Sequence, residues 1–296
     1  MTSSAGSSGT TSAGSAASDL QLQVVVGLAD GAVEYCTNDD WSQLQGTGWD
    51  SGVQCMAVNW MPSGDPQVIV GLENSSIQFY NGSSWSQLQG LGWDSTAAQL
   101  AVDWAVSGSP QIVVGLANGA VEFYNGSGWS QLQGTGWSTY INSMAVNWQG
   151  SSTPQVVVGR GDSAVESYNG SSWTELHNNS WASNARQLAA NWTSSGDLEV
   201  VVGLTSGAVE YYNGSGWNQL QESGGSTVYN SAVQWSNAAW ALGDYTVTQC
   251  PVAPYAEISS AGTWSTTGPS TTLPGIASLQ KLPDRKSTRL NSSHRT

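Results

Sequence analysis

Tryptophans in Gly-rich stretches, repeated beside carboxylate or amide residues, are the pattern in this sequence closest to a binding chemistry. An indole face can stack on the apolar face of a pyranose, while a neighbouring carboxylate or amide binds its hydroxyls. The sequence therefore predicts up to four carbohydrate sites, and the alternative is that each Trp is wedged between structural units as packing. The candidate residues are Trp49, Trp93, Trp137 and Trp181, with Asp30, Asn74, Asn118 and Asp162 as hydrogen-bonding neighbours.

The fifth position of the Trp series is Gly225, so a fifth site is expected to be weak or missing. Neutral sugars are the expected ligands, because an acidic sugar needs a cation to pair with it and the repeats carry only Arg160 and Arg186. The same shortage of arginine argues against a sialidase-type site. Arg160-Gly161-Asp162 spells an integrin-recognition tripeptide, but sister copies read Leu-Ala-Asp or Leu-Ala-Asn there, which favours sequence drift.

Catalytic residues are not predicted. His177 is the one histidine in the repeats, and the other copies have Gln at its position. The sequence shows neither a His and Cys cluster with metal-ligand spacing nor an Asp-rich calcium loop. The prediction is a protein that is not an enzyme and that uses no metal and no cofactor.

Two further polar series recur through the chain. One is Glu at mid-strand positions, and the other precedes a strand-ending Trp. Either could bind a ligand, but repeated polar residues more often hold structure together, and we expect them to tie neighbouring units to each other. The series are Glu34, Gln78, Glu122, Glu166 and Glu210, and Asn59, Asp103, Asn147, Asn191 and Gln234.

A 44-residue unit, repeated five times, must position all of these residues. Its apolar strand sequence begins at Gln23 and returns at Gln67, Gln111, Gln155 and Glu199. Such a period is typical of solenoids and propellers, in which one unit cannot bury its apolar face alone. In the third copy we predict strands at 99–104, 111–116, 120–124 and 129–133, with hairpin turns at 117–119 and 125–126.

Four short strands in about 44 residues match one blade of a β-propeller. The second strand is apolar on both faces, so stacked blades should cover it, whereas the polar fourth strand suits an outer edge. Five first strands and five three-strand sets are present, and the ends complement each other: 231–235 lacks a following set and 23–27 lacks a first strand. The prediction is an all-β, five-bladed β-propeller closed by Ala232–Trp235 pairing with Val24–Val26. A sixth, degenerate blade from 231–268 is the first alternative, and a linear solenoid is the second.

The predicted organisation has four parts. Residues 1–19 are a Ser/Gly-rich linker, 20–236 are the five-repeat propeller, and 237–283 are an irregular extension. Residues 284–296 are expected to be an artefact, because 284–294 look like translated sequencing adapter. We recognise neither a signal peptide nor an apolar run long enough to span a membrane.

Acidic composition limits the partners. Residues 1–283 carry 20 Asp and Glu against three basic side chains, a net charge of −17. Nucleic acid and anionic membrane surfaces are poor partners for this chain, because binding to either one needs Lys and Arg. Cys36, Cys55 and Cys250 do not form a disulfide framework, although a Cys36–Cys55 bridge stays open. The composition is typical of secreted or cell-surface repeat proteins, so an extracellular location is expected.

Residues 21–235 resemble lectin-like β-propellers, in particular five-bladed tachylectin-type proteins. The resemblance lies in blade length, near-identical copies and Gly/Asn/Trp-rich loops. It implies multivalent recognition of neutral glycans, in which several weak sites gain avidity together. The alternative is a structural or protein-interaction propeller, and buried rather than exposed loop Trp would favour it.

Overall fold

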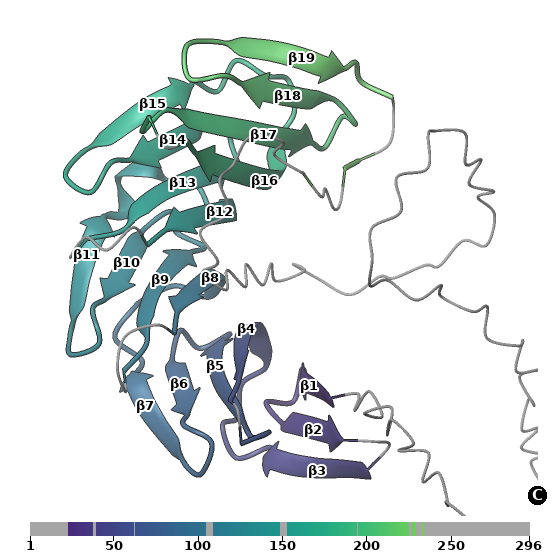
Figure 1. Ribbon diagram of the computed structural model, residues 1–296, viewed down its shortest axis with the longest axis vertical. Helices are drawn as coiled ribbons and strands as arrows, with labels where there is room; N and C mark the ends of the chain where they lie inside the picture. Colours follow the sequence, from purple (N-terminus) through teal and green to yellow (C-terminus); the bar gives the residue numbers. More distant parts are fainter. Residues whose placement is uncertain are drawn as a thin grey trace, which may run out of the picture. The chain divides into compact units, whose positions relative to one another are not determined.

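Antiparallel sheets, one for each repeat, make up the computed structural model (Figure 1). It describes residues 23–37, 40–61, 63–104, 109–148, 153–193, 195–224, 227–228 and 233. The first sheet is β1 (Gln23–Gly27), β2 (Val33–Thr37) and β3 (Asp40–Gln45), in that order. The second is β4 (Val53–Trp60), β5 (Pro66–Leu72), β6 (Ile77–Tyr80) and β7 (Trp85–Gln89).

The remaining three sheets repeat this meander with four strands each. The third is β8 (Ala97–Asp103), β9 (Gln111–Leu116), β10 (Val121–Tyr124) and β11 (Trp129–Gln133). A 3-10 turn, η1 (Thr135–Trp137), leads to β12 (Ile141–Asn147), β13 (Gln155–Arg160), β14 (Val165–Tyr168) and β15 (Trp173–His177). The fifth is β16 (Ala185–Trp192), β17 (Leu198–Leu204), β18 (Val209–Tyr212) and β19 (Trp217–Gln221).

The predicted strands of the third repeat are confirmed almost to the residue. β9 and β11 have the predicted bounds, β10 begins one residue later than expected, and β8 begins two residues earlier and ends one residue earlier. The hairpin turn at 117–119 also forms, and Gly119 adopts the positive φ of 88° that favours glycine there. Alternating polarity and turn residues were therefore sufficient to define the blade.

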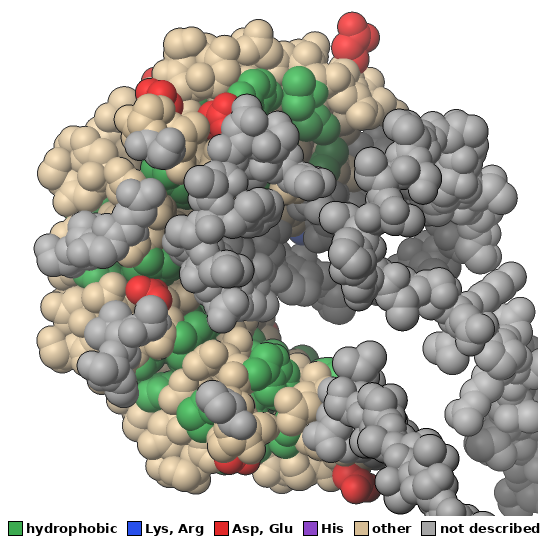
Figure 2. All heavy atoms as spheres, viewed as in Figure 1, with side chains coloured by type: hydrophobic (Ala, Val, Ile, Leu, Met, Phe, Trp, Pro, Cys, Tyr) green, Lys and Arg blue, Asp and Glu red, His purple; other side chains and the backbone are tan. Residues whose placement is uncertain are grey.

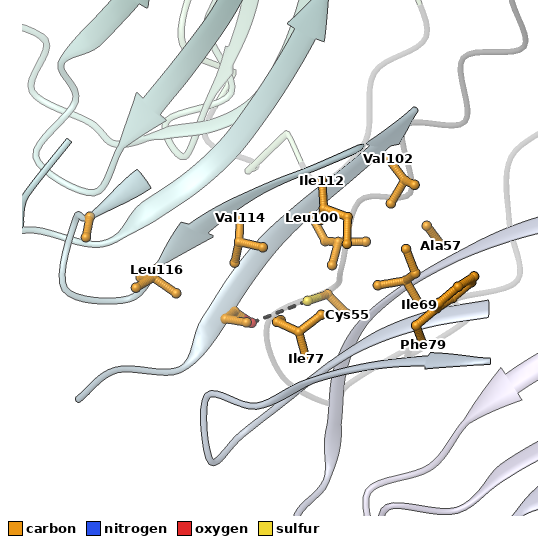
Figure 3. Packing of buried hydrophobic residues seen from close by; sticks show 12 residues of the cluster. Cys55, Ala57, Ile69, Ile77, Phe79, Leu100, Val102, Ile112, Val114 and Leu116 are labelled. Atoms are coloured by element: carbon orange, nitrogen blue, oxygen red, sulfur yellow. Dashed lines mark hydrogen bonds between the residues drawn. The ribbon is translucent and has the colours of Figure 1, made fainter. Parts of the chain in front are cut away.

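Apolar side chains of neighbouring sheets interlock to form the core. Leu100 of β8 and Ile112 and Val114 of β9 face Ile69 of β5 and Ile77 of β6 (Figure 3), and all five are at most 2% exposed. Second strands are buried on both faces, as predicted, because sheets stack on each side of them. Burial of apolar surface is favourable by about 25 cal/mol per Å², so these contacts between sheets stabilise the fold.

A β-bulge recurs in the outer strand of every sheet. In β11 the register jumps, since Val121 faces Gln133 but Glu122 faces Gln131, which leaves Leu132 as the extra residue. The same jump falls at Leu44, Leu88, Leu176 and Leu220. A bulged residue is left out of the strand ladder, so its backbone is available to another partner.

The protein is all-β, and its five sheets are consistent with a five-bladed β-propeller. The predicted closing segment 231–235 lies outside the described residues except for Val233, as does the alternative sixth blade at 231–268. The linker at 1–19, the extension at 237–283 and the tail at 284–296 also lie outside them. Within the described residues no helix is long and apolar enough to cross a membrane.

Cys36 and Cys55 are both buried and both reduced, so the bridge that the sequence left open does not form. The Cys55 thiol instead donates a hydrogen bond to the Ala97 carbonyl of the next sheet, with sulfur and oxygen 3.5 Å apart. Its role is packing between the second and third sheets (Figure 3).

Candidate functional site

One end of each sheet brings together the two series that the sequence singled out. The hairpin between the second and third strands lies beside the Trp of the same repeat. Ser75 Oγ donates to the Trp93 carbonyl, and Ser163 Oγ donates to the Trp181 carbonyl at 2.9 Å. In the third repeat, a Cβ placed on Gly119 would lie 3.5 Å from the Trp137 Cβ. We call this end of the sheets the hairpin face.

The Asp and Asn residues of the hairpin face cap their own turns. In each, Oδ1 accepts a hydrogen bond from the backbone N–H two residues further on, at 3.1 to 3.3 Å. This is the Asx-turn, which short polar side chains form where the backbone has no strand partner. One side-chain oxygen is therefore used by the fold. The residues are Asp30, Asn74, Asn118 and Asp162.

The loop Trp residues pack across the junctions between sheets. Each is half-buried and meets, edge to face, the Trp that begins the outer strand of the next sheet. The pairs are Trp49–Trp85, Trp93–Trp129, Trp137–Trp173 and Trp181–Trp217, with ring centroids 4.7 to 4.8 Å apart and planes at 84 to 88°. Edge-to-face pairs add about 0.5–1.5 kcal/mol to the burial of their surface. The indoles thus serve packing and still keep part of their surface in solvent.

The outer-strand Trp completes the junction through the bulge. Its Nε1 donates to the carbonyl of the bulged Leu in the preceding sheet, at 2.8 to 2.9 Å. The four bonds are Trp85 to Leu44, Trp129 to Leu88, Trp173 to Leu132 and Trp217 to Leu176. Trp41 of the first sheet matches the donor Trp residues but is 56% exposed. Leu220 of the fifth sheet matches the bulged Leu residues but is 60% exposed.

Six members of the two polar series form hydrogen bonds within their own sheets, and for these the prediction that they tie neighbouring units together is wrong. Asn59 and Asn147 donate to Gln67 and Gln155, which face them directly across the first and second strands. Glu122 accepts a bond from Gln131 on the outer strand at 2.9 Å. The Cβ atoms of directly opposite residues on neighbouring strands are about 5 Å apart. Residues of the next sheet are farther away, so these side chains bond within their own sheet.

Burial raises the pKa of the Glu122 carboxyl and that of Glu210 above the ordinary value, while the Gln partner of each partly offsets this. Both carboxylates are accordingly costly to ionise in the folded protein. Gln78 occupies the same position in the second repeat. We therefore interpret the mid-strand Glu series as structural, and Gln78 shows that an amide can replace the carboxylate in one repeat.

The fourth repeat departs from its sisters around Arg160. Glu175 stands where the third and fifth repeats have Gln131 and Gln219, so Glu166 faces another carboxylate across the strands. Arg160 replaces a buried Leu and supplies the missing cation. Its guanidinium binds Glu166 at 2.8 Å and Asp162 at 2.5 Å, and lies 5.0 Å from the centre of the Trp137 ring.

This geometry does not present the Arg160-Gly161-Asp162 tripeptide for recognition. The Arg160 side chain is only 11% exposed and its guanidinium is paired inside the repeat, so it is not displayed for a receptor. Burial raises the pKa of Glu166, and the charge of Arg160 lowers it again in part.

His177 is also packed between aromatic rings. Its imidazole stacks on Trp181, with centroids 3.5 Å apart and planes at 15°, and it meets Trp217 edge to face. Burial lowers its pKa below the ordinary histidine value. Ser180 Oγ lies 3.3 Å from the His177 Nε2. Among the described residues, no three His, Cys, Asp or Glu side chains lie together as a metal site.

No protein-family model matches the chain, and the search of curated proteins finds no match either. Among solved structures, it is similar to BBS1N, crystallised in complex with ARL6DN and soaked with lead, at a TM-score of 0.47 and 18% identity over 65% of this chain and 60% of that one. It is also similar to Sqt1 from Chaetomium thermophilum, at a TM-score of 0.48 and 17% identity over 66% of this chain and 54% of that one. The chain thus spans less than two thirds of these structures.

Sequence reasoning missed one surface residue of the hairpin face. Tyr140 is 44% exposed, and its ring lies over Gly161 of the next hairpin. The positions that match Tyr140 in other repeats are Gly52, Thr96 and Asn184. Aligning the copies position by position would have revealed it, because a lone aromatic interrupts a series of small and polar residues.

Proposed function

We propose that this chain is a non-enzymatic binding module whose hairpin face receives a protein partner. The observation that carries the proposal is that the hairpin tips differ from repeat to repeat, whereas the Asn-Gly-Ser turns at the opposite end do not. A multivalent lectin needs one site repeated, whereas a single protein surface is matched by a composite patch that differs at each junction. The tips of the hairpin face are of the second kind.

The hairpin tips differ from one repeat to the next. The first tip residue is Ala29, Glu73, Ala117, Gly161 or Thr205 in successive repeats. At the opposite end, the Asn-Gly-Ser turn between the third and fourth strands is the same four times. Asn81, Asn125, Asn169 and Asn213 each accept bonds from two backbone N–H groups and a Ser hydroxyl there.

Charge supports a protein partner with basic groups. The hairpin face carries acidic residues at Asp30, Asp50, Glu73 and Asp94, and Arg160 beside it is neutralised by its own carboxylates. Figure 2 shows acidic side chains as separate patches on a mostly uncharged surface. Dispersed charge of one sign favours encounter and selection of a partner more than raw affinity.

The experiment places a cation at either end of the sheets. The paired change Ala29→Lys and Ala117→Lys alters two exposed hairpin tips, and Ser83→Lys with Ser127→Lys is the matched control at the Asn-Gly-Ser end. The labelled whole chain is applied to a protein microarray and to a glycan array. We expect protein signals that fall about tenfold for the hairpin pair and not for the control, since tenfold is about 1.4 kcal/mol. Loss with the control pair alone, or signals on glycans alone, contradicts the proposal.

Neutral carbohydrate is the second candidate, and the partly exposed loop Trp residues favour it. Each keeps solvent-facing surface beside an Asp or Asn, at four equivalent places. The lectin resemblance of the sequence agrees with this candidate. It predicts binding on the glycan array with an avidity that falls stepwise as Trp93 and Trp137 are replaced, in variants whose circular dichroism stays that of the parent. The expected setting for either candidate is extracellular.

A further inference from the structure

One junction of the hairpin face differs from the others in a way that creates a recognition patch. From this geometry we infer that Tyr140, Gly161 and Asp162 bind an arginine or lysine side chain presented by a protein partner. The inference rests on the proposed protein-binding function and names the place and chemistry of its central contact.

The first step is that Tyr140 has room because Gly161 lacks a side chain. A Cβ at Gly161 would meet the Cζ, Cε1 and Cε2 atoms of Tyr140 at 2.5 to 2.7 Å, which is far inside van der Waals contact. The sister tips carry Ala, Glu or Thr at that position, and their sister connections carry Gly, Thr or Asn in place of Tyr. The aromatic ring and the missing side chain therefore occur together, at one junction only.

The second step is that the ring is held in place. The Gly161 N–H donates to the Tyr140 carbonyl at 2.9 Å, and Asn184 Nδ2 donates to the Tyr140 hydroxyl at 3.4 Å. A positioned aromatic that is still 44% exposed loses little conformational entropy on binding. Tyrosine of this kind is a residue type enriched at binding hot spots.

The third step is the charge around the ring. Asp162 follows Gly161 directly, and its side chain is 30% exposed. Arg160 is one cation beside three carboxylates, those of Asp162, Glu166 and Glu175, so negative charge is in local excess. A guanidinium or ammonium over the Tyr140 ring would gain a cation–π contact and the carboxylate together. A neutral sugar could also use the ring and the carboxylate, but it brings no positive charge to either.

The test compares peptide libraries that differ in one residue. Immobilised hexapeptide libraries with a fixed central arginine are probed with the whole chain, next to the same libraries with glutamine at that position. Tyr140→Thr installs the residue of the second repeat, Thr96, and Leu91→Thr removes another exposed apolar side chain, 71% exposed, as the matched control. Thermal unfolding verifies that both variants fold.

We expect the arginine libraries to bind better than the glutamine libraries, and Tyr140→Thr to reduce that binding about tenfold while Leu91→Thr leaves it unchanged. Equal binding of the two libraries, or no effect of Tyr140→Thr, would overturn the inference. So would glycan-array binding that depends on Tyr140 while peptide binding does not. If the lysine substitutions at the hairpin tips abolish protein binding but Tyr140→Thr does not, the proposed function stands and this inference fails. If nothing binds in either assay, both fail.

Discussion

The four inner junctions and the outward faces of the two terminal sheets are built from the same residues, yet those residues do different things. At each inner junction an outer-strand Trp donates to a bulged Leu carbonyl and meets a loop Trp edge to face. On the terminal sheets, Trp41 and Leu220 are exposed. Stability in such a repeat protein therefore belongs to the contact between neighbours more than to the unit itself.

The largest expected effect comes from removing the same indole at an inner junction and at the end. Trp129→Ala deletes a half-buried ring, its bond to the Leu88 carbonyl and its contact with Trp93, and should cost about 3–5 kcal/mol of unfolding free energy. Trp41→Ala should cost about 0.5 kcal/mol or less, as at exposed sites. Urea unfolding of both variants measures the difference.

Equal costs would change the interpretation of the ends. They would mean that Trp41 is covered in solution, as the ring closure predicted from the sequence requires. In that event the Leu220 carbonyl is the expected acceptor for the Trp41 Nε1. The Leu220 side chain would then be buried too, so Leu220→Ala should lower the free energy of unfolding by at least about 2 kcal/mol. If Trp41→Ala and Leu220→Ala both lower the free energy of unfolding only slightly, stabilising contacts between sheets are limited to the four inner junctions.

The second prediction concerns the ion pairs of the fourth repeat. Arg160→Leu restores the sister residue but leaves Glu166 opposite Glu175 without a cation, and should cost about 3 kcal/mol. Adding Glu175→Gln restores the Gln partner seen in the third and fifth repeats, and the double variant should return close to parental stability. A double-mutant cycle measures this coupling. Additive losses would show that Arg160 acts on stability by some other contact.

The strands, turns and stacking of the sheets could be predicted because each depends on local pattern and period. The bulge at Leu132 and the hydrogen bond that it accepts from Trp173 could not be predicted. The acceptor is a backbone carbonyl, which every residue has, so the sequence does not identify it. The loop Trp residues were placed at the correct junctions, but whether they stack on a ligand or pack depends on the neighbouring ring. Tyr140 and Gly161 could have been found by aligning the copies, because both differ from the residues at the matching positions of the other repeats.

The third prediction uses the pH dependence of the buried carboxylates. The folded-state pKa of Glu122 is raised by burial, so its stabilising form is the protonated one, present below the unfolded pKa near 4.5 and lost as pH rises through the folded pKa. Glu122→Gln, the residue of the second repeat, should therefore raise stability at pH 7. The gain should shrink as pH falls towards 4, which thermal unfolding at several pH values measures. A gain that does not change with pH would exclude titration of Glu122 as its cause.

The smallest expected effect is that of His177, the residue that interrupts the Gln series. Its folded-state pKa is lowered by burial between Trp181 and Trp217, so the neutral ring is favoured in the fold. Stability is present above the unfolded pKa, near 6.5, and is lost as pH falls through the folded value. His177→Gln removes the titration and keeps a side chain that the other repeats accept.

At pH 8 the parent and His177→Gln should differ little, since stacking of the neutral ring is exchanged for an amide tolerated at four equivalent positions. At pH 5 the variant should be the more stable, because the parent must protonate a ring that the fold disfavours in charged form. The difference in melting temperature between the two proteins, followed from pH 8 to pH 5, isolates this group from the carboxylates that titrate in both. A difference that stays constant would mean that the imidazole binds its proton equally well in the folded and unfolded chain, and that the stacked geometry does not exclude the charged ring.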